Sequence, residues 1–151
     1  MARIPAMIFL SLSAAGFAHA SLDIKTIHFP EGKPLTAQTA SDIDTVLDVE
    51  ERRTLEAIRD ALQQSPSLGV EVAGYADKNE CSISECYTLS LRRARIILDW
   101  LSTHGVPEAQ LKGPVGESVD FPLYEGATAE ERSFNRRVHF EAYTVEESEA
   151  R

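Results

Sequence analysis

Acidic and basic side chains that together can hold a small zwitterion stand at three places along the sequence. Asp77 follows an alternating apolar segment, so we expect it at the end of a strand. The basic side chains come in two groups, Arg92, Arg93 and Arg95 in one and Arg136 and Arg137 in the other. A carboxylate attracts an ammonium group, and a guanidinium holds a carboxylate through two hydrogen bonds. The pattern favours equally a site for a zwitterionic ligand and a structural Asp–Arg bridge.

The sequence contains no arrangement of residues that is typical of catalysis. His28, His104 and His139 lack metal-ligand spacing to one another or to a cysteine. Zinc-protease, nucleophile-elbow and glycine-rich phosphate-binding motifs are all missing from the sequence. Adjacent acidic pairs such as Glu50 and Glu51 are typical of a solvated acidic face rather than of glycosidase chemistry. We therefore predict a protein that is not an enzyme, with no cofactor and no metal.

The first twenty residues have the features of an export signal. Arg3 is the only charged residue among them, an apolar run extends from Ile4 to Ala18, and Ala18-His19-Ala20 has the small-x-small form of a cleavage site. The run is short for a membrane span, although an uncleaved anchor is the alternative reading. We expect cleavage after Ala20, a mature chain without a membrane span, and a periplasmic location.

The predicted export determines the expected chemical state of the two cysteines. Cys81 and Cys86 are the only cysteines in the sequence, and exported proteins fold under oxidising conditions. We predict a disulfide that closes a small loop. A zinc site or a redox pair is disfavoured, because there is no histidine nearby and because redox pairs usually have two intervening residues.

Length and charge restrict the remaining possibilities. The chain has 151 residues and a formal net charge of −9, which becomes −10 when residues 1–20 are removed. This length supports one domain, predicted over residues 21–145 with a frayed acidic tail at residues 146–151. The acidic balance argues against nucleic acid and against charge-driven attachment to anionic lipid. An anionic ligand would need a local basic site.

Hydrophobic periodicity predicts the elements that would position these side chains. Segments 22–29, 70–75, 111–115 and 137–143 are predicted as strands, and segments 49–64 and 89–104 as helices. Residues 36–48 are interpreted as a loop that leads into the first helix, and residues 116–135 as a long polar connection. The order β-α-β-α-β-β predicts an α+β fold, with a mixed sheet and helices packed on one of its faces.

Four short segments, in order, resemble the motifs of the OmpA-like C-terminal domain family. They are Gly74-Tyr75-Ala76-Asp77, Leu89-Ser90-Leu91-Arg92-Arg93-Ala94, Gly116-Glu117-Ser118 and Asn135-Arg136-Arg137-Val138. The family reads roughly G-x-T-D, L-S-x-x-R-A, G-x-G-E-S and N-R-R-V. The resemblance covers about residues 24–143.

The resemblance implies non-covalent binding of peptidoglycan through the meso-diaminopimelate residue of its stem peptide. The free end of that residue carries an ammonium group and a carboxylate on one carbon. Asp77 matches the family's ligand-binding aspartate and Arg93 its ligand-binding arginine, while Arg137 and Arg136 are implied to lie near the pocket.

The sequence departs from the family pattern in the segment that would border the site. Glu80 stands where the family often has glycine, Cys86 stands where an asparagine commonly lines the pocket, and the segment between Asp77 and Arg93 is one residue longer. The altered loop Lys78–Tyr87 either preserves, blocks or redirects ligand binding. The alternative function is therefore a periplasmic protein-interaction or inhibitor subunit of an envelope complex that reuses the fold.

Overall fold

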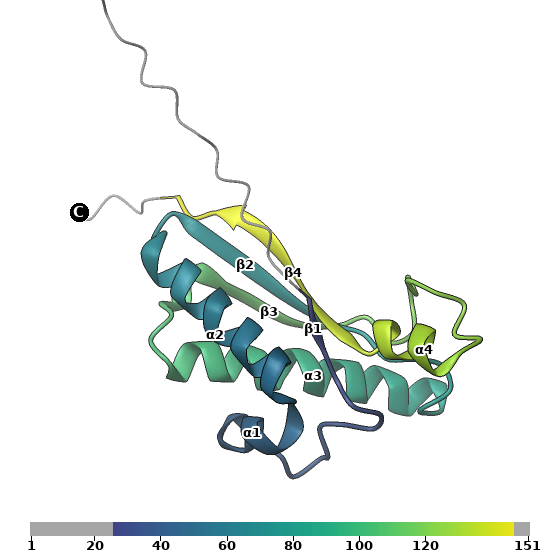
Figure 1. Cartoon of the computed structure of the whole chain (residues 1–151). Helices are drawn as coiled ribbons and strands as arrows, with labels where there is room; N and C mark the ends of the chain where they lie inside the picture. The colour runs from purple at the N-terminus through teal and green to yellow at the C-terminus, as the bar shows by residue number, and fades with distance from the viewer. Residues whose placement is uncertain (1–25, 147–151) are drawn as a thin grey trace, which may run out of the picture.

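Four strands form one mixed sheet in the computed structural model, which describes residues 26–146 (Figure 1). The sheet order is β1-β4-β2-β3, with β1 Ile27–His28, β2 Leu68–Gly74, β3 Leu111–Gly116 and β4 Arg137–Thr144. Strand β4 pairs antiparallel with both β1 and β2, and β3 pairs parallel with β2. The signal segment 1–20, its cleavage site and residues 147–151 of the tail lie outside the described residues.

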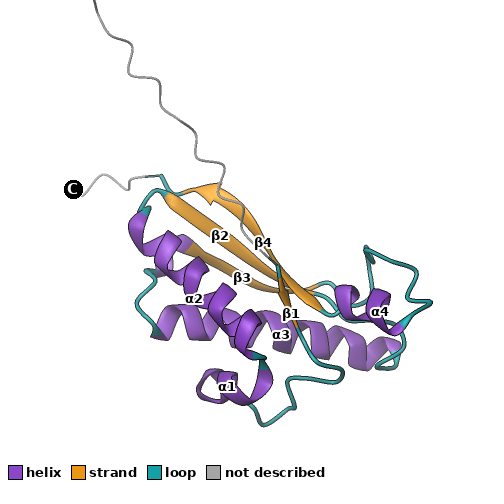
Figure 2. Ribbon diagram, viewed as in Figure 1, coloured by secondary structure: helices purple, strands orange, loops and turns teal. Residues whose placement is uncertain are grey.

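Two long helices cover one face of the sheet (Figure 2). Helix α2 spans Val49–Gln64. Asp48 caps its N-terminus, because its side chain accepts hydrogen bonds from the first-turn N–H groups of Glu50 and Glu51. Helix α3 spans Ile83–Thr103, and a reciprocal capping box between Ser82 and Glu85 fixes its start.

Shorter helical segments connect the main elements of the fold. A 3₁₀ turn η1 (Ala40–Asp42) leads into α1 (Ile43–Val46), and a second turn η2 (Glu108–Gln110) precedes β3. Helix α4 (Ala129–Asn135) leads directly to β4. No helix among residues 26–146 is long and apolar enough to cross a membrane.

The hydrophobic core lies between the sheet and the two long helices. Strands β2 and β4 contribute alternate residues, because side chains at every second position share one face of a strand. Trp100, in the last turn of α3, is 1% exposed. The other large contributors come from all of these elements: Leu55, Ile58, Leu62, Val70, Val72, Ile97, Leu101, Val138 and Phe140.

The predicted α+β class, with a mixed sheet and helices on one face, is confirmed. Three predictions about the elements were wrong. Residues 36–48, interpreted as a loop that leads into the first helix, contain the turn η1 and the short helix α1. Helix α3 begins at Ile83, six residues before the predicted start at Leu89, because the capping box starts the helix ahead of its apolar stripe. The segment 116–135, predicted as a long polar connection, contains α4, which the Thr128 side chain caps through the N–H of Glu131. Strand β1 is short, and the earlier part of the predicted segment 22–29 lies outside the described residues.

Strand β2 ends beside the start of α3, with α4 at the same end of the sheet (Figure 1). Gly74 allows this close approach, because a Cβ at that position would overlap the carbonyl of Ser90 on α3. The hydroxyl of Ser90 also accepts the N–H of Ser118 at 2.9 Å, which ties the segment after β3 to the helix. All four sequence motifs therefore meet at this end of the fold.

Candidate functional site

Asp77 lies three residues beyond the end of β2, and its carboxylate is held on both oxygens. Oδ1 accepts the backbone N–H and the side-chain amide of Asn79, at 2.9 and 3.0 Å. Oδ2 accepts the side-chain amide of Asn135 at 3.1 Å. Only 2% of the residue is exposed. A carboxylate so fixed is oriented before any ligand arrives.

These contacts also determine the protonation state of Asp77. Burial by itself would raise the pKa of its carboxyl group, because a low-dielectric environment disfavours the charged form. The hydrogen bonds from Asn79 and Asn135, together with the positive charge of Arg136, outweigh burial and lower the pKa below its ordinary value. The buried carboxylate is therefore negatively charged at neutral pH.

Asn135, the last residue of α4, connects Asp77 to the β3–α4 loop (residues 117–128). Its Oδ1 accepts the N–H groups of Leu123 and Tyr124, at 2.9 and 3.1 Å. Its Nδ2 donates to the carbonyl of Tyr124 at 2.9 Å as well as to Asp77. The single side chain thus fixes both the carboxylate and the loop that faces it.

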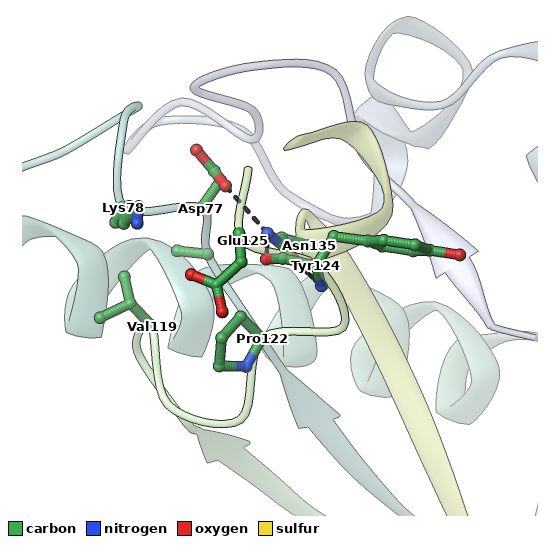
Figure 3. A pocket seen from close by; sticks show the side chains of 8 residues that line it. Asp77, Lys78, Val119, Pro122, Tyr124, Glu125 and Asn135 are labelled. Atoms are coloured by element: carbon green, nitrogen blue, oxygen red, sulfur yellow. Dashed lines mark hydrogen bonds between the residues drawn. The ribbon is translucent and has the colours of Figure 1, made fainter. Parts of the chain in front are cut away.

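A cavity of about 70 Å³ lies beside Asp77 (Figure 3). Its walls come from the segment after β2, the β3–α4 loop and the end of α4, and consist of Ala76, Asp77, Lys78, Val119, Pro122, Tyr124, Glu125 and Asn135. The side chains of Lys78 and Tyr124 lie on opposite sides of the cavity (Figure 3). With Asp77 and Glu125 in its wall, the cavity suits a small positively charged group such as an ammonium.

Arg93 lies in the same region but forms an ion pair with a different carboxylate. Its Nη1 and Nη2 donate to Oε1 and Oε2 of Glu80, at 2.6 and 2.8 Å. The side chains of Arg93 and Glu80 are 0% and 2% exposed. Burial lowers the pKa of the Arg93 guanidinium, and the hydrogen bonds and charge of Glu80 oppose that effect.

Glu80 connects the two residues that the sequence pattern placed in one site. Its Oε1 also accepts the backbone N–H of Asp77 at 2.9 Å, and its Oε2 accepts the N–H of Gly32 at 2.9 Å. The structure therefore brings Asp77 and Arg93 to the same corner of the fold through Glu80, not through a direct bridge. Their ligand-binding role stays a prediction.

Arg136 and Arg137, the other predicted site residues, flank the corner. The Nε of Arg136 donates to the carbonyl of Phe29 at 3.0 Å. The guanidinium of Arg137 stacks over the ring of Tyr75, 3.8 Å from its centroid, and Nη2 donates to Phe121 at 3.1 Å. Its buried Nη1 finds no hydrogen-bond partner among the described residues. Burial lowers the pKa of Arg137, partly offset by Tyr75.

Cys81 and Cys86 form the predicted disulfide, and no free cysteine remains among the described residues. Cys81 directly follows Glu80, and Cys86 lies in the first turn of α3. The bridge therefore fastens the segment that carries Glu80 to the helix that carries Arg93.

Sequence reasoning did not assign a site role to three residues that the structure places there. Glu80 was noted only as a departure from the family pattern, and Asn135 only as the first residue of its motif. Gly126 was not considered, yet a Cβ on it would lie 3.2 Å from Asp77 Oδ2. The sequence offered only weak signals for these roles. Glu80 is a single acid after Asp77, Asn135 precedes two arginines, and Gly126 is a glycine in a polar loop.

Comparison with known proteins identifies the family. A sequence model of the OmpA family matches residues 41–136. No curated protein matches the sequence at a significant level. The fold is similar to that of a peptidoglycan-associated lipoprotein from Burkholderia pseudomallei, with 18% identity and a TM-score of 0.62, over 79% of this chain and 90% of that one.

Two further structures share the fold. The C-terminal domain of Helicobacter pylori MotB is 20% identical, with a TM-score of 0.62 over 80% of this chain and 84% of that one. A cell wall anchor of the T6SS from Pseudomonas aeruginosa is 27% identical, with a TM-score of 0.55 over 66% of this chain and 70% of that one. Because the family model spans more than half of the residues, the chain belongs to the OmpA family.

Proposed function

We propose that this protein binds peptidoglycan non-covalently in the periplasm, and that Asp77 receives an ammonium group of the diaminopimelate residue in the stem peptide. Membership of the OmpA family supports a binding role without catalysis. The names of the structural neighbours, a peptidoglycan-associated lipoprotein and a cell wall anchor, agree with the proposed ligand.

One observation carries the proposal. Asp77 is a buried carboxylate, and its lowered pKa keeps it charged beside a cavity of about 70 Å³. A buried charge is costly unless an opposite charge contacts it, and Arg136 acts only from a distance, so binding of a cation in this site is favourable. An ammonium group is small enough for this space and donates hydrogen bonds, whereas every group that fixes Asp77 in place is a neutral amide.

Arg93 has a positioning role in this proposal. Its contact with Glu80 anchors the turn that follows Asp77, since Glu80 also accepts the N–H of Asp77. Arg136 lowers the pKa of Asp77 from a distance, and Arg137 supports the β3–α4 loop through the carbonyl of Phe121.

Co-sedimentation with purified sacculi tests the proposal. We expect mature wild-type protein to sediment with diaminopimelate-containing sacculi and the variant Asp77→Asn to remain in solution. Asparagine has nearly the same shape but keeps only one acceptor oxygen, so the variant removes the charge together with the hydrogen bonds from either Asn79 or Asn135. Glu130→Gln, which removes an exposed acid on α4, is the matched control. Equal sedimentation of Asp77→Asn and wild type would contradict the proposal.

A second candidate function is docking of an envelope protein partner. It is favoured by two apolar side chains in the β3–α4 loop, Phe121 at 76% and Leu123 at 55% exposure, next to the cavity. Affinity capture from periplasm with wild type, Asp77→Asn and the double variant Phe121→Ser/Leu123→Ser separates the two functions. A partner kept by Asp77→Asn and lost by the double variant would support docking.

A further inference from the structure

Every N–H group of Arg93 is already committed within the chain. A guanidinium carries five such groups. Two of them point at Glu80, and the other three donate to the carbonyl oxygens of Lys33, Tyr75 and Pro30, at 2.8, 2.9 and 3.4 Å. No donor of Arg93 is left for a molecule from outside.

The carboxylate of Glu80 is equally saturated. It accepts two hydrogen bonds from Arg93, one from the N–H of Asp77 and one from the N–H of Gly32. An ionised carboxylate offers about four lone-pair positions, so each of them is used. Glu80 therefore binds the guanidinium of Arg93 through two hydrogen bonds, in the geometry that a ligand carboxylate would adopt.

The cavity beside Asp77 is lined by two acids and one lysine, and by no arginine. Arg93 does not line it, whereas Asp77 and Glu125 do. Lys78 also lines it, but its side chain is exposed, and a lysine is a flexible point charge rather than a two-point receptor. A carboxylate brought in next to an ammonium group would therefore meet the buried charge of Asp77 and no guanidinium, while the charges of Glu125 and Lys78 are both on exposed side chains.

We propose that Glu80 acts as an internal substitute for a ligand carboxylate, so that the site prefers an ammonium group whose neighbouring carboxyl is neutral over a free zwitterion. This inference rests on the proposed function and names the ligand class of that site. In peptidoglycan terms, the favoured ligand is a stem peptide in which the carboxyl next to the ammonium carries an amide. Glu80 is the residue that determines this specificity.

The surrounding structure keeps Glu80 in place. Cys81 follows it directly and is bonded to Cys86 on α3, the helix that also carries Arg93. For a free zwitterion to reach Arg93, its carboxylate would have to expel Glu80 and leave the backbone N–H groups of Asp77 and Gly32 without their acceptor. Buried donors left unpaired are unfavourable, so displacement of Glu80 by a ligand carboxylate would cost free energy.

Chemical rescue tests the substitution without peptidoglycan. The variant Glu80→Ala empties the receptor on Arg93, so we expect acetate to raise its melting temperature in a saturable manner, measured against chloride at equal ionic strength. Acetate should not shift the wild type or the control Glu31→Ala, which removes an exposed acid from the neighbouring loop. The same acetate response in Glu80→Ala and the wild type would overturn the proposal.

Ligand preference is then measured by titration calorimetry with two muramyl tripeptides, one with the free carboxyl on the diaminopimelate side chain and one with the carboxamide. Wild type should bind the amidated peptide about tenfold more tightly, because like charges in a desolvated site repel. Glu80→Ala should lose or reverse that preference. Because the wild-type measurement needs no variant, the test stands even where Glu80→Ala folds poorly.

The outcomes separate this inference from the proposed function. A wild type that binds both peptides equally, or prefers the free acid, would overturn the inference while leaving peptidoglycan binding intact. If the affinity for the free acid were lower in the variant Lys78→Ala, Lys78 would be the residue that binds the ligand carboxylate. A wild type that binds neither peptide would contradict the proposed function and the ligand preference that rests on it, and acetate rescue of Glu80→Ala would then decide only whether Glu80 occupies the carboxylate position on Arg93.

Discussion

Arg93 and Glu80 form an ion pair from which water is excluded, with N–O distances of 2.6 and 2.8 Å between the guanidinium and the carboxylate. Neither side chain is more than 2% exposed. Removal of one partner leaves the other charge buried and unpaired, which is more costly than the pair is stabilising. A substitution at either residue of the pair is therefore expected to destabilise the whole domain as well as to alter the site.

The first prediction concerns this pair. Arg93→Ala should lower the free energy of unfolding by about 3–5 kcal/mol, because the charge of Glu80 loses its partner. The double variant Glu80→Ala/Arg93→Ala should be more stable than Arg93→Ala, since it contains no orphaned charge. Urea denaturation of the three proteins measures both effects. An Arg93→Ala protein as stable as wild type would contradict the prediction.

The second prediction concerns pH. Because the pKa of Asp77 is lowered in the folded state, its charge stabilises the fold at pH values above the ordinary carboxyl pKa of 3.8, and this contribution is lost as the pH falls through the lowered value. Asp77→Asn should flatten that part of the stability profile. Thermal melts of both proteins between neutral and strongly acidic pH measure it, and parallel profiles would show that Asp77 is not the titrating group.

The third prediction concerns Gly126, which lies close to the carboxylate of Asp77. Its φ angle is +80°, and an added Cβ would lie 3.2 Å from Asp77 Oδ2. Gly126→Ala should therefore weaken sacculus binding as well as cost about 1 kcal/mol of stability from backbone strain. Gly105→Ala, at a φ angle of +90° beyond the end of α3, has the same kind of strain far from Asp77 and is the control. Equal binding by the two variants would show that strain alone is responsible.

The fourth prediction concerns the disulfide. A loop this short contributes about 2 kcal/mol through chain entropy, so the double variant Cys81→Ser/Cys86→Ser should fold. Its main effect should be local: faster amide hydrogen exchange at residues 77–82, where residue 81 would no longer be bonded to α3 and only the Glu80–Arg93 ion pair would remain. Exchange measured by mass spectrometry checks this, with peptides of α2 as an internal reference. Unchanged exchange at residues 77–82 would mean that the ion pair alone holds the segment.

The sequence predicts most of the fold because periodicity records which faces are buried. The stripe of α2 and the alternation of β2 and β4 identify the core correctly. The start of α3 was misplaced because Ser82 and Glu85 begin the helix with polar capping contacts, which an apolar pattern does not contain. Helix α4 was missed for a similar reason, since its seven residues include no apolar stripe.

The candidate site was harder to predict, because it depends on which carboxylate reaches which cation. Asp77 and Arg93 were identified from type and spacing and from the family motifs. The acid that contacts Arg93 is Glu80, three residues beyond Asp77, and sequence spacing does not distinguish the two. Asn135 was passed over because an asparagine gains its importance only from four simultaneous contacts.

Helix α3 carries Cys86, Ser90 and Arg93 at successive i, i+4 and i+7 positions, which share one side of a helix. Together they hold two segments at three points: Cys81 by a covalent bond, Glu80 next to it by an ion pair, and Ser118 by a hydroxyl group. The same helix continues into the core at Ile97 and Trp100. All three contacts are thus made by one helix, so a small rotation of α3 would shift them together. A substitution that shifts α3 in the core would therefore displace the walls of the cavity beside Asp77 without first breaking their contacts.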